Sequence, residues 1–350
     1  MSARHIPVGW NASKLAYDAI ALGLIALYLL LFLRIAPALQ DTTQNWDGPS
    51  YAMRAYGSCA FLLLSLVLAI GPLARLDPRF LPLVYNRRHL GVMTCAVALM
   101  HAQAVIGWYF SYSPGDPYAL LLSANTSYGR ISGFPFEIFG AFALLVLLLL
   151  AATSHDFWLA FLSPPIWKAL HMAIYLAYAA VVAHVALGAM QASTTPFLAL
   201  MLLTCAGGLA ALHLAAARKT ARDDAAHAAP TPEPPWRRAG RLDDIEEGRA
   251  MTVALAEGER VAIFRHAGQL AAVTDLCAHQ NGPLGEGRII DDCITCPWHG
   301  FQYRFADAAA PPPFTERLAT YPLRLVGQEV WLDPRPRPPG DPVPPLAIPS

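Results

Sequence analysis

Three cysteines and two histidines lie within 24 residues of the stretch CAHQNGPLGEGRIIDDCITCPWHG, which begins at Cys277. Cys277-x-His279 is followed, after 16 residues, by Cys296-x2-His299. Thiolates and imidazoles are ligands of zinc and of iron, so the pattern predicts a metal site. A zinc site could use Cys293 as a third thiolate. However, Cys-x-His is closer than the usual ligand spacing of zinc fingers.

The residues around this metal motif predict a small β domain. Region 236–333 alternates short β-rich runs (RVAIFR, LAAVTDL, EVWLD) with turn residues, which is typical of an all-β domain. Residues 218–235 are mostly polar and rich in proline and alanine, so they are predicted to be a linker. Residues 334–350 are predicted to be a disordered tail, because the last 18 residues contain eight prolines.

The rest of the chain has the composition of a membrane protein. Residues 1–217 hold 17 charged side chains, whereas the remaining residues hold 33. Each apolar segment approaches the ~20 residues that cross a bilayer as a helix. We therefore expect a multi-domain protein: a six-helix transmembrane bundle over 1–217, then the β domain. The alternative is a set of buried core helices in a large soluble protein. The six predicted spans are about 16–36, 58–74, 90–110, 134–153, 168–189 and 196–217.

Basic residues predict the orientation of the spans. They lie in the second and fourth loops and directly after the sixth span, whereas the first loop carries Asp41 and Asp47 and the fifth has no charge. By the positive-inside rule, both termini and the metal motif face the cytoplasm, in a multi-pass protein of the inner (plasma) membrane. The formal net charge of zero gives no indication of a nucleic-acid partner. The basic residues are Arg75, Arg79, Arg87, Arg88, Lys168, Arg218, Lys219 and Arg222.

The metal motif resembles a Rieske domain, in which two loops each supply one cysteine and one histidine to a [2Fe–2S] cluster. The resemblance covers about 100 residues and includes GPLGEG (282–287) and PPPFTE (312–317). It implies that Cys277 and Cys296 bind one iron and that His279 and His299 bind the other. Cys293 is then a strand residue with no redox role.

At three neighbouring positions this domain resembles the ferredoxin type rather than the respiratory type. Gly282 and Trp298 stand where the respiratory type has a disulfide, and Phe301 stands where that type has a serine that donates to a bridging sulfur. Fewer donors stabilise the reduced cluster less, so we expect a potential toward the low end of the Rieske range.

The apolar half resembles ferric-reductase-like transmembrane cytochromes over about 55–215. Within these it resembles the haem-binding membrane subunit of the periplasmic methionine-sulfoxide reductase system. The motifs are IGPLARL, RRHLG, ALMH and WKALHMAIYLAY. Histidines inside a membrane are functional candidates by default. The resemblance implies that His101, His171 and His184 are ligands of one or two b haems.

Helix geometry is consistent with two haem levels. His184 lies 13 residues after His171, roughly 20 Å further along a helix, and His101 lies 12 residues after His89, roughly 18 Å. His101 and His184 then share one level, and His89 and His171 the other. Twelve residues turn an ideal helix by ~120°, so His89 and His101 do not share a face. The alternative for His89 is an interfacial residue that contacts lipid headgroups.

These features predict a membrane electron-transfer protein that connects a cytoplasmic Rieske cluster with haem in the bilayer. An oxygenase would need a mononuclear iron site downstream, but no histidine follows His299. The chain has no evident flavin or nicotinamide site, so it is an oxidoreductase component whose redox donor and acceptor are other proteins or a quinone. The alternatives are a redox sensor and a Rieske domain on a haem-free membrane anchor.

Overall fold

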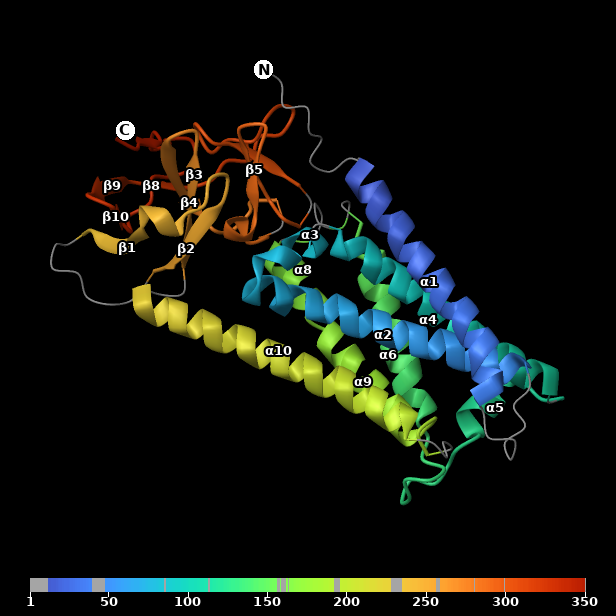
Figure 1. Cartoon of the computed structure of the whole chain (residues 1–350). Coiled ribbons are helices and arrows are strands. Elements are labelled where there is room, and N and C mark those ends of the chain that lie inside the picture. The colour runs from blue at the N-terminus through green and yellow to red at the C-terminus, as the bar shows by residue number, and fades with distance from the viewer. Residues whose placement is uncertain are drawn as a thin grey trace. The chain divides into compact units, whose positions relative to one another are not determined.

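The computed structural model describes two compact units. It covers residues 12–39, 48–84, 86–112, 114–155, 158, 162, 164–191, 196–227, 235–255, 259–279, 281–298 and 300–349. A helical unit contains residues 13–69 and 87–212, and a β unit contains residues 70–86 and the chain from His213 onward. Figure 1 shows helices through the first part of the chain and strands after residue 235.

In the part of the chain that the structure describes, six apolar segments form the N-terminal region, as the sequence predicts, and they are built from seven helices. Five are long and apolar enough to cross a membrane, and α6 is a shorter apolar helix. The fifth predicted span is built from two helices, α8 and α9, which together supply the apolar stretch Ile166–Leu187. The helices are α1 (Ala12–Leu39), α2 (Gly48–Leu76), α4 (Arg87–Tyr112), α6 (Glu137–Ala152), α8 (Pro164–His171), α9 (Ile174–Leu187) and α10 (Phe197–His227).

Short helices occur in the connections. The 3₁₀ helix η1 (Pro78–Phe80) and helix α3 (Leu81–Val84) follow α2. Helix α5 (Pro117–Ser123) begins after Asp116, whose side chain accepts a hydrogen bond from the Ala119 backbone N–H at 2.8 Å. This N-cap satisfies one of the free N–H groups at the start of a helix.

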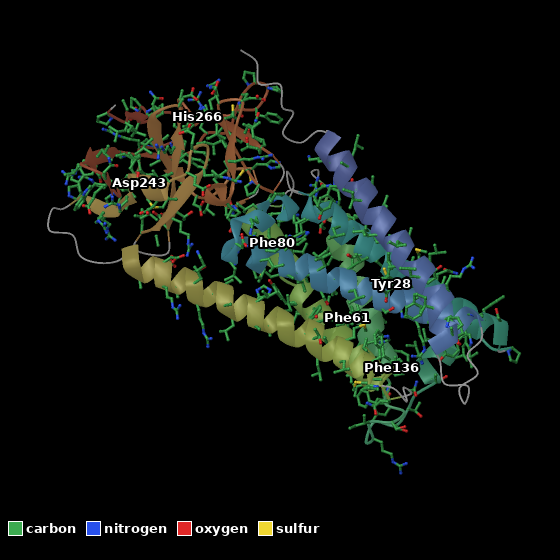
Figure 2. All side chains as sticks on the ribbon, in the orientation of Figure 1. Tyr28, Phe61, Phe80, Phe136, Asp243 and His266 are labelled. Carbon is green, nitrogen blue, oxygen red and sulfur yellow. The ribbon has the colours of Figure 1, made fainter. Side chains whose placement is uncertain are left out.

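The helical unit packs through aromatic and small polar side chains. Phe61, labelled in Figure 2, is 1% exposed and stacks on Tyr178 with 5.7 Å between the ring centroids. The Tyr178 hydroxyl lies 3.0 Å from Ser65 Oγ, and the Tyr28 hydroxyl of α1 donates to Ser58 Oγ at 2.8 Å. Many leucines of these helices are exposed, as lipid-facing side chains are.

The described residues of the β unit form three small sheets. The first has the strand order β1-β10-β9, and the second has the order β11-β4-β3-β2, with β8 also paired to β4. The third is the antiparallel sheet β5-β6-β7. The strands are β1 (Arg237–Arg241), β2 (Ala250–Ala254), β3 (Arg260–His266), β4 (Gln269–Thr274), β5 (Arg288–Ile290), β6 (Cys293–Thr295), β7 (Gln302–Arg304), β8 (Thr320–Tyr321), β9 (Leu323–Val326), β10 (Glu329–Leu332) and β11 (Leu346–Ala347).

The alternating side chains of β3 and β4 face two apolar clusters. Phe264 and Val273 join the cluster that contains both cysteines of the Cys–His pairs. Ile263 and Leu270 join a second cluster with the β1, β9 and β10 side of the domain. Because successive residues of a strand point to opposite faces, one hairpin serves both cores.

The predicted disordered tail is wrong where the structure describes it. Strand β11 pairs antiparallel with β4, with Leu346 opposite Leu270, and the Ile348 N–H donates to the Gly268 carbonyl at 2.9 Å. Earlier in the segment, the Val343 N–H donates to Thr320 Oγ1 at 2.8 Å. Backbone hydrogen bonds to β4 and the β8 region therefore order a segment whose many prolines suggested disorder.

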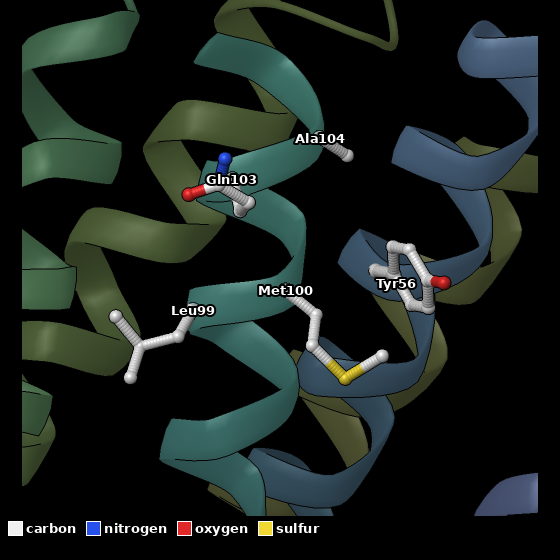
Figure 3. Close-up of a pocket in the computed structure, with 5 residues that line it drawn as sticks. All are labelled: Tyr56, Leu99, Met100, Gln103 and Ala104. Carbon is white, nitrogen blue, oxygen red and sulfur yellow. The ribbon is translucent and has the colours of Figure 1, made fainter. Parts of the chain in front are cut away.

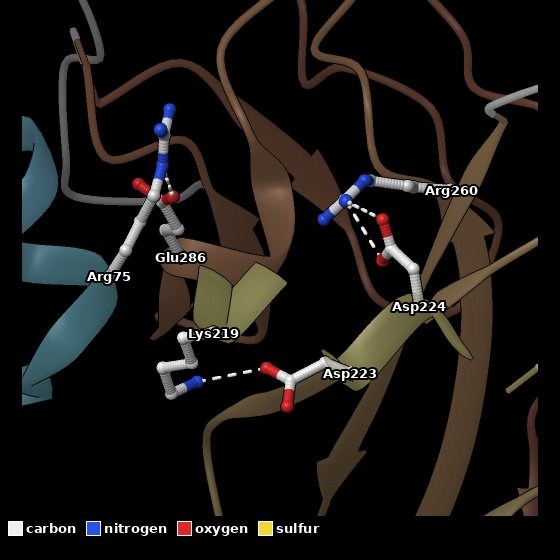
Figure 4. Close-up of polar contacts among 6 residues, drawn as sticks. All are labelled: Arg75, Lys219, Asp223, Asp224, Arg260 and Glu286. Carbon is white, nitrogen blue, oxygen red and sulfur yellow. Dashed lines mark hydrogen bonds and ion pairs between the residues drawn. The ribbon is translucent and has the colours of Figure 1, made fainter. Parts of the chain in front are cut away.

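The predicted linker is also too long at its start, because α10 continues to His227. Alanine-rich sequence favours this extension, and Lys219 pairs with Asp223 at 3.0 Å one turn later. Figure 4 shows two further ion pairs inside the β unit, Arg260–Asp224 at 2.7 Å and Arg75–Glu286 at 3.5 Å. Both pairs are partly solvated, so each contributes little to stability.

Candidate functional site

Two turns in the β unit hold the Cys–His pairs. One follows β4, where the Cys277 N–H donates to the Gly282 carbonyl at 2.9 Å. The other connects β6 to β7, where the Cys296 N–H donates to the Phe301 carbonyl at 2.8 Å and the Gly300 N–H donates back to Cys296 at 2.9 Å. Each cysteine is therefore fixed at the base of a tight, hydrogen-bonded loop.

The two loops approach each other closely. Cys277 is 0% exposed and Cys296 is 1% exposed, and both belong to one apolar cluster. A Cβ atom at Gly282 would stand 2.7 Å from Cys296 Sγ, so glycine lets the first loop contact the second. Two buried cysteines on facing loops could supply two thiolates to one metal cluster.

His279 lies beside the same centre. Its ring stacks on Phe301 with 4.8 Å between centroids and an angle of 8° between planes. The structure therefore brings Cys277, His279 and Cys296 to one end of the domain, and these residues could hold a cluster. His299, the fourth residue of the motif, lies outside the described residues.

Tyr303 is a site residue that the sequence analysis missed. Its hydroxyl lies 3.4 Å from Cys277 Sγ, and its ring is 0% exposed. Burial, followed by the nearby Cys277 sulfur, raises the pKa of Tyr303, so the hydroxyl stays protonated and can donate. In the sequence, the indication of this role was that Tyr303 lies only seven residues after Cys296, in a β-rich run that follows the second Cys–His pair.

Two buried side chains near these loops have shifted pKa values. Burial raises the pKa of Asp275 to about 6, although its carboxylate accepts a 2.6 Å hydrogen bond from the Gly285 N–H. Burial also raises the pKa of the Cys293 thiol to about 11. Cys293 lies in β6, paired with Ile290 and Arg304 on either side, as a structural strand residue does.

The helical unit brings two of the predicted histidines together. His101 of α4 and His184 of α9 have ring centroids 6.3 Å apart and planes at 82°. His101 Nδ1 lies 2.9 Å from the Met53 carbonyl oxygen, and His184 Nδ1 lies 3.0 Å from the Phe136 carbonyl oxygen. A carbonyl only accepts, so each Nδ1 carries the proton and each Nε2 has a free lone pair.

The spacing of the two rings would allow both histidines to bind one iron. A metal–imidazole bond is about 2 Å and a ring nitrogen lies about 1.1 Å from the ring centre, so two ligands on one iron have centroids about 6 Å apart. Plain aromatic pairs also occur at such distances. The tautomer is compatible with metal binding, because both rings bond the protein through Nδ1 and leave Nε2 for a metal.

His171 and His89 have other surroundings. His171 donates through Nδ1 to the Trp167 carbonyl at 3.0 Å and stacks on the Trp167 ring at 3.7 Å. Its buried Nε2 has no hydrogen-bond partner among the described residues, so it could ligate a metal. His89 instead donates through Nδ1 to Asp18 of α1 at 2.7 Å. The structure thus ties His89 to α1.

A shallow groove of about 470 Å³ lies on the same pair of helices that holds His101. It is lined by Tyr56 of α2 and by Leu99, Met100, Gln103 and Ala104 of α4 (Figure 3). Two lining residues directly precede Gly57 and His101 in the chain. No titratable carboxyl, thiol or imidazole lines it, so we assign it no part in electron transfer.

Comparison with known protein families agrees with this division of the chain. Residues 56–182 match the ferric reductase like transmembrane component, and residues 235–322 match the Rieske [2Fe-2S] domain. The chain is therefore a membrane protein with a [2Fe–2S] domain. The first match contains His101 of the histidine pair, whereas His184 lies two residues beyond its end.

Curated relatives match the β unit. The anthranilate 1,2-dioxygenase ferredoxin subunit of Burkholderia cepacia is 33% identical over 96 residues, which are 27% of this chain and 88% of that protein. The biphenyl dioxygenase ferredoxin subunit of Pseudomonas sp. (strain KKS102) is 35% identical over 95 residues, 26% of this chain and 85% of that protein. A solved complex of reduced oxygenase and oxidized ferredoxin in carbazole 1,9a-dioxygenase matches at 25% identity, 29% of this chain and 96% of that chain, with a TM-score of 0.28. Since such ferredoxin subunits are matched over most of their own length, the chain belongs to the Rieske [2Fe-2S] family through its C-terminal domain, which it joins to a ferric reductase like transmembrane component.

Proposed function

We propose that this protein transfers electrons between a cytoplasmic Rieske [2Fe–2S] cluster and b haem in the membrane. The cluster ligands are Cys277, His279, Cys296 and His299. The observation that carries the proposal is the His101–His184 pair, with ring centroids 6.3 Å apart and both Nδ1 atoms bonded to backbone carbonyls.

A [2Fe–2S] cluster and a b haem each take up and release one electron when bound. The chain's own residues supply the surroundings that tune these groups. Buried Cys277 and Cys296 keep the thiolate side of the cluster away from water, and Tyr303 adds a hydrogen-bond donor to one sulfur. In the helical unit, backbone carbonyls fix the orientation of both imidazoles, which raises their basicity as ligands.

His171 is the proposed ligand of a second haem. Its Nδ1 is held by its own helix and its Nε2 is buried without a partner among the described residues, which supports a ligand role. His89 stays a weaker candidate for the opposite ligand, because its Nδ1 already bonds Asp18. In the proposal, one haem lies between His101 and His184, and any second haem lies nearer the cytoplasmic side with His171.

The proposed direction is from cluster to haem and outward. Basic residues in the second and fourth loops and after α10 support a cytoplasmic position for both termini and the Rieske domain. Dioxygenase ferredoxin subunits are the relatives of this domain, which supports a ferredoxin-like exchange with a separate redox protein. That redox protein would be the donor at the cluster, and an acceptor protein or a quinone would take up the electrons at the haem end.

Absorption and paramagnetic resonance spectra of membranes that contain the full chain test the proposal. The expected result is a b-type absorption together with the signal of a histidine-ligated [2Fe–2S] cluster, and His184→Ala should lose the former and keep the latter. A cluster signal without b-type absorption would instead favour the haem-free anchor. Both centres without steady reduction of any external acceptor would favour a redox sensor.

A further inference from the structure

The imidazole of His101 hydrogen-bonds to the backbone of the neighbouring helix α2 and packs against a glycine of that helix. Its Nδ1 donates to the carbonyl of Met53 on α2, and the residue one turn later, Gly57, faces the same ring. A Cβ atom at Gly57 would stand 3.0 Å from His101 Nδ1 and 3.1 Å from its Cε1. The imidazole therefore occupies the space that a side chain at position 57 would fill.

The same feature occurs again at His184. Its Nδ1 donates to the carbonyl of Phe136, at the start of α6, and Gly140 follows one turn later. A Cβ atom at Gly140 would stand 2.7 Å from His184 Nδ1 and 2.8 Å from its Cε1. Each histidine lies 48 residues after the residue whose carbonyl it bonds. Phe136, Gly140 and His184 each lie 83 positions after Met53, Gly57 and His101, respectively.

Helix geometry explains why both positions are glycine. A helical carbonyl at residue i points toward the N–H of residue i+4 and keeps a second lone pair. A side chain from another helix reaches that lone pair beside residue i+4, where the Cβ of that residue would stand. A residue without a Cβ at i+4 therefore gives an imidazole room to bond the carbonyl.

We infer that Gly57 and Gly140 are positioning residues, which orient the two axial imidazoles of one haem through the carbonyls one turn earlier. This inference rests on the proposed function of His101 and His184. The inference adds to the proposed function, because it assigns the orientation of the two histidine ligands to two matching helix pairs, α2 with α4 and α6 with α9. The two pairs hold their imidazoles at 82° to each other.

Alanine substitutions in the full-length protein test the inference, with haem content measured per [2Fe–2S] cluster. Gly107→Ala on α4 is the matched control, because nothing lies within 4 Å of the Cβ that it would add. We expect Gly140→Ala to lose most of its six-coordinate b-type absorption, or to become able to bind carbon monoxide as the His184 bond breaks. Gly57→Ala should show the same change to a smaller extent, and Gly107→Ala should match the parent.

The order of these effects follows from the distances, because a contact of 2.7 Å forces a shift and one of 3.0 Å lies at the limit that a small shift relieves. Parent-like spectra and midpoint potentials in both Gly57→Ala and Gly140→Ala would overturn the inference while leaving the haem proposal intact. A parent protein that binds no haem would overturn both.

A measurement on the parent protein covers the case in which Gly140→Ala does not fold. Imidazole planes near perpendicular give oxidised low-spin haem a strongly anisotropic resonance signal with one large g value, whereas near-parallel planes give three well-resolved g values. We expect the first form. The second form would show that the carbonyls do not orient the two rings, and it would overturn the inference.

Discussion

Tyr303→Phe should lower the reduction potential of the cluster. The Tyr303 hydroxyl lies 3.4 Å from Cys277 Sγ, and a cysteine that ligates iron is a thiolate, which only accepts hydrogen bonds. The hydroxyl must therefore donate. Reduction adds negative charge to the cluster, so a donor to its sulfur stabilises the reduced form more than the oxidised form.

The size of the effect follows from the single bond that is removed. A neutral hydrogen bond contributes about 0.5–1.5 kcal/mol, and about 59 mV corresponds to a tenfold change for a one-electron couple, so we expect a drop of about 20–60 mV. Phenylalanine keeps the ring, which is 0% exposed and packs near Phe301 with 5.3 Å between centroids. The change therefore removes the donor with little effect on packing.

The assay is a redox titration of the full chain followed by paramagnetic resonance of the reduced cluster. Tyr321→Phe is the control, since Tyr321 is buried in the other apolar cluster of the β unit. An unchanged or higher midpoint potential in Tyr303→Phe would contradict the reasoning, because it would mean that the hydroxyl does not donate to the Cys277 sulfur.

Four further substitutions test the proposed ligands and their neighbours. Cys293→Ser should keep the cluster iron and Cys296→Ser should lose it, and equal loss of iron would mean that the wrong cysteine was chosen. Because the pKa of the Cys293 thiol is raised to about 11, its alkylation in the folded protein should be slow near pH 8, and the rate should rise as the pH approaches 11. Phe301→Ser should raise the cluster potential in a redox titration, and no shift would contradict the placement of Phe301 beside the cluster. His171→Ala should remove at most a second haem, so complete loss of b-type absorption in this variant would contradict the pairing of the other two histidines.

The sequence predicted the parts of the fold that depend on composition. Apolar segments of bilayer length and alternating β-rich runs are local properties, and both appear as expected. The tail was misread because proline content is also local, whereas the pairing of Leu346 with Leu270 depends on a contact 76 positions away. The extension of α10 to His227 was missed because charged residues suggested a linker, although alanine favours helix.

The candidate site was predictable only where spacing carries the information. The Cys-x-His and Cys-x2-His pairs lie at a fixed separation, and the structure brings Cys277 and Cys296 into one apolar cluster. The His89–Asp18 contact joins α1 to α4, and no spacing within one helix reveals it. His101 and His184 bond backbone carbonyls, which every residue has, so residue type does not reveal these acceptors. Only the glycines one turn later are visible as a sequence feature.

A redox titration of the full-length protein in membranes tests the central claim most directly, with the cluster followed by paramagnetic resonance and haem by absorbance in one sample. We predict that both centres titrate reversibly in the same protein and that the cluster's midpoint lies below that of at least one haem. Reduction of the cluster with no haem absorbance at any potential would contradict the account, and a cluster midpoint well above every haem would reverse the proposed direction of transfer.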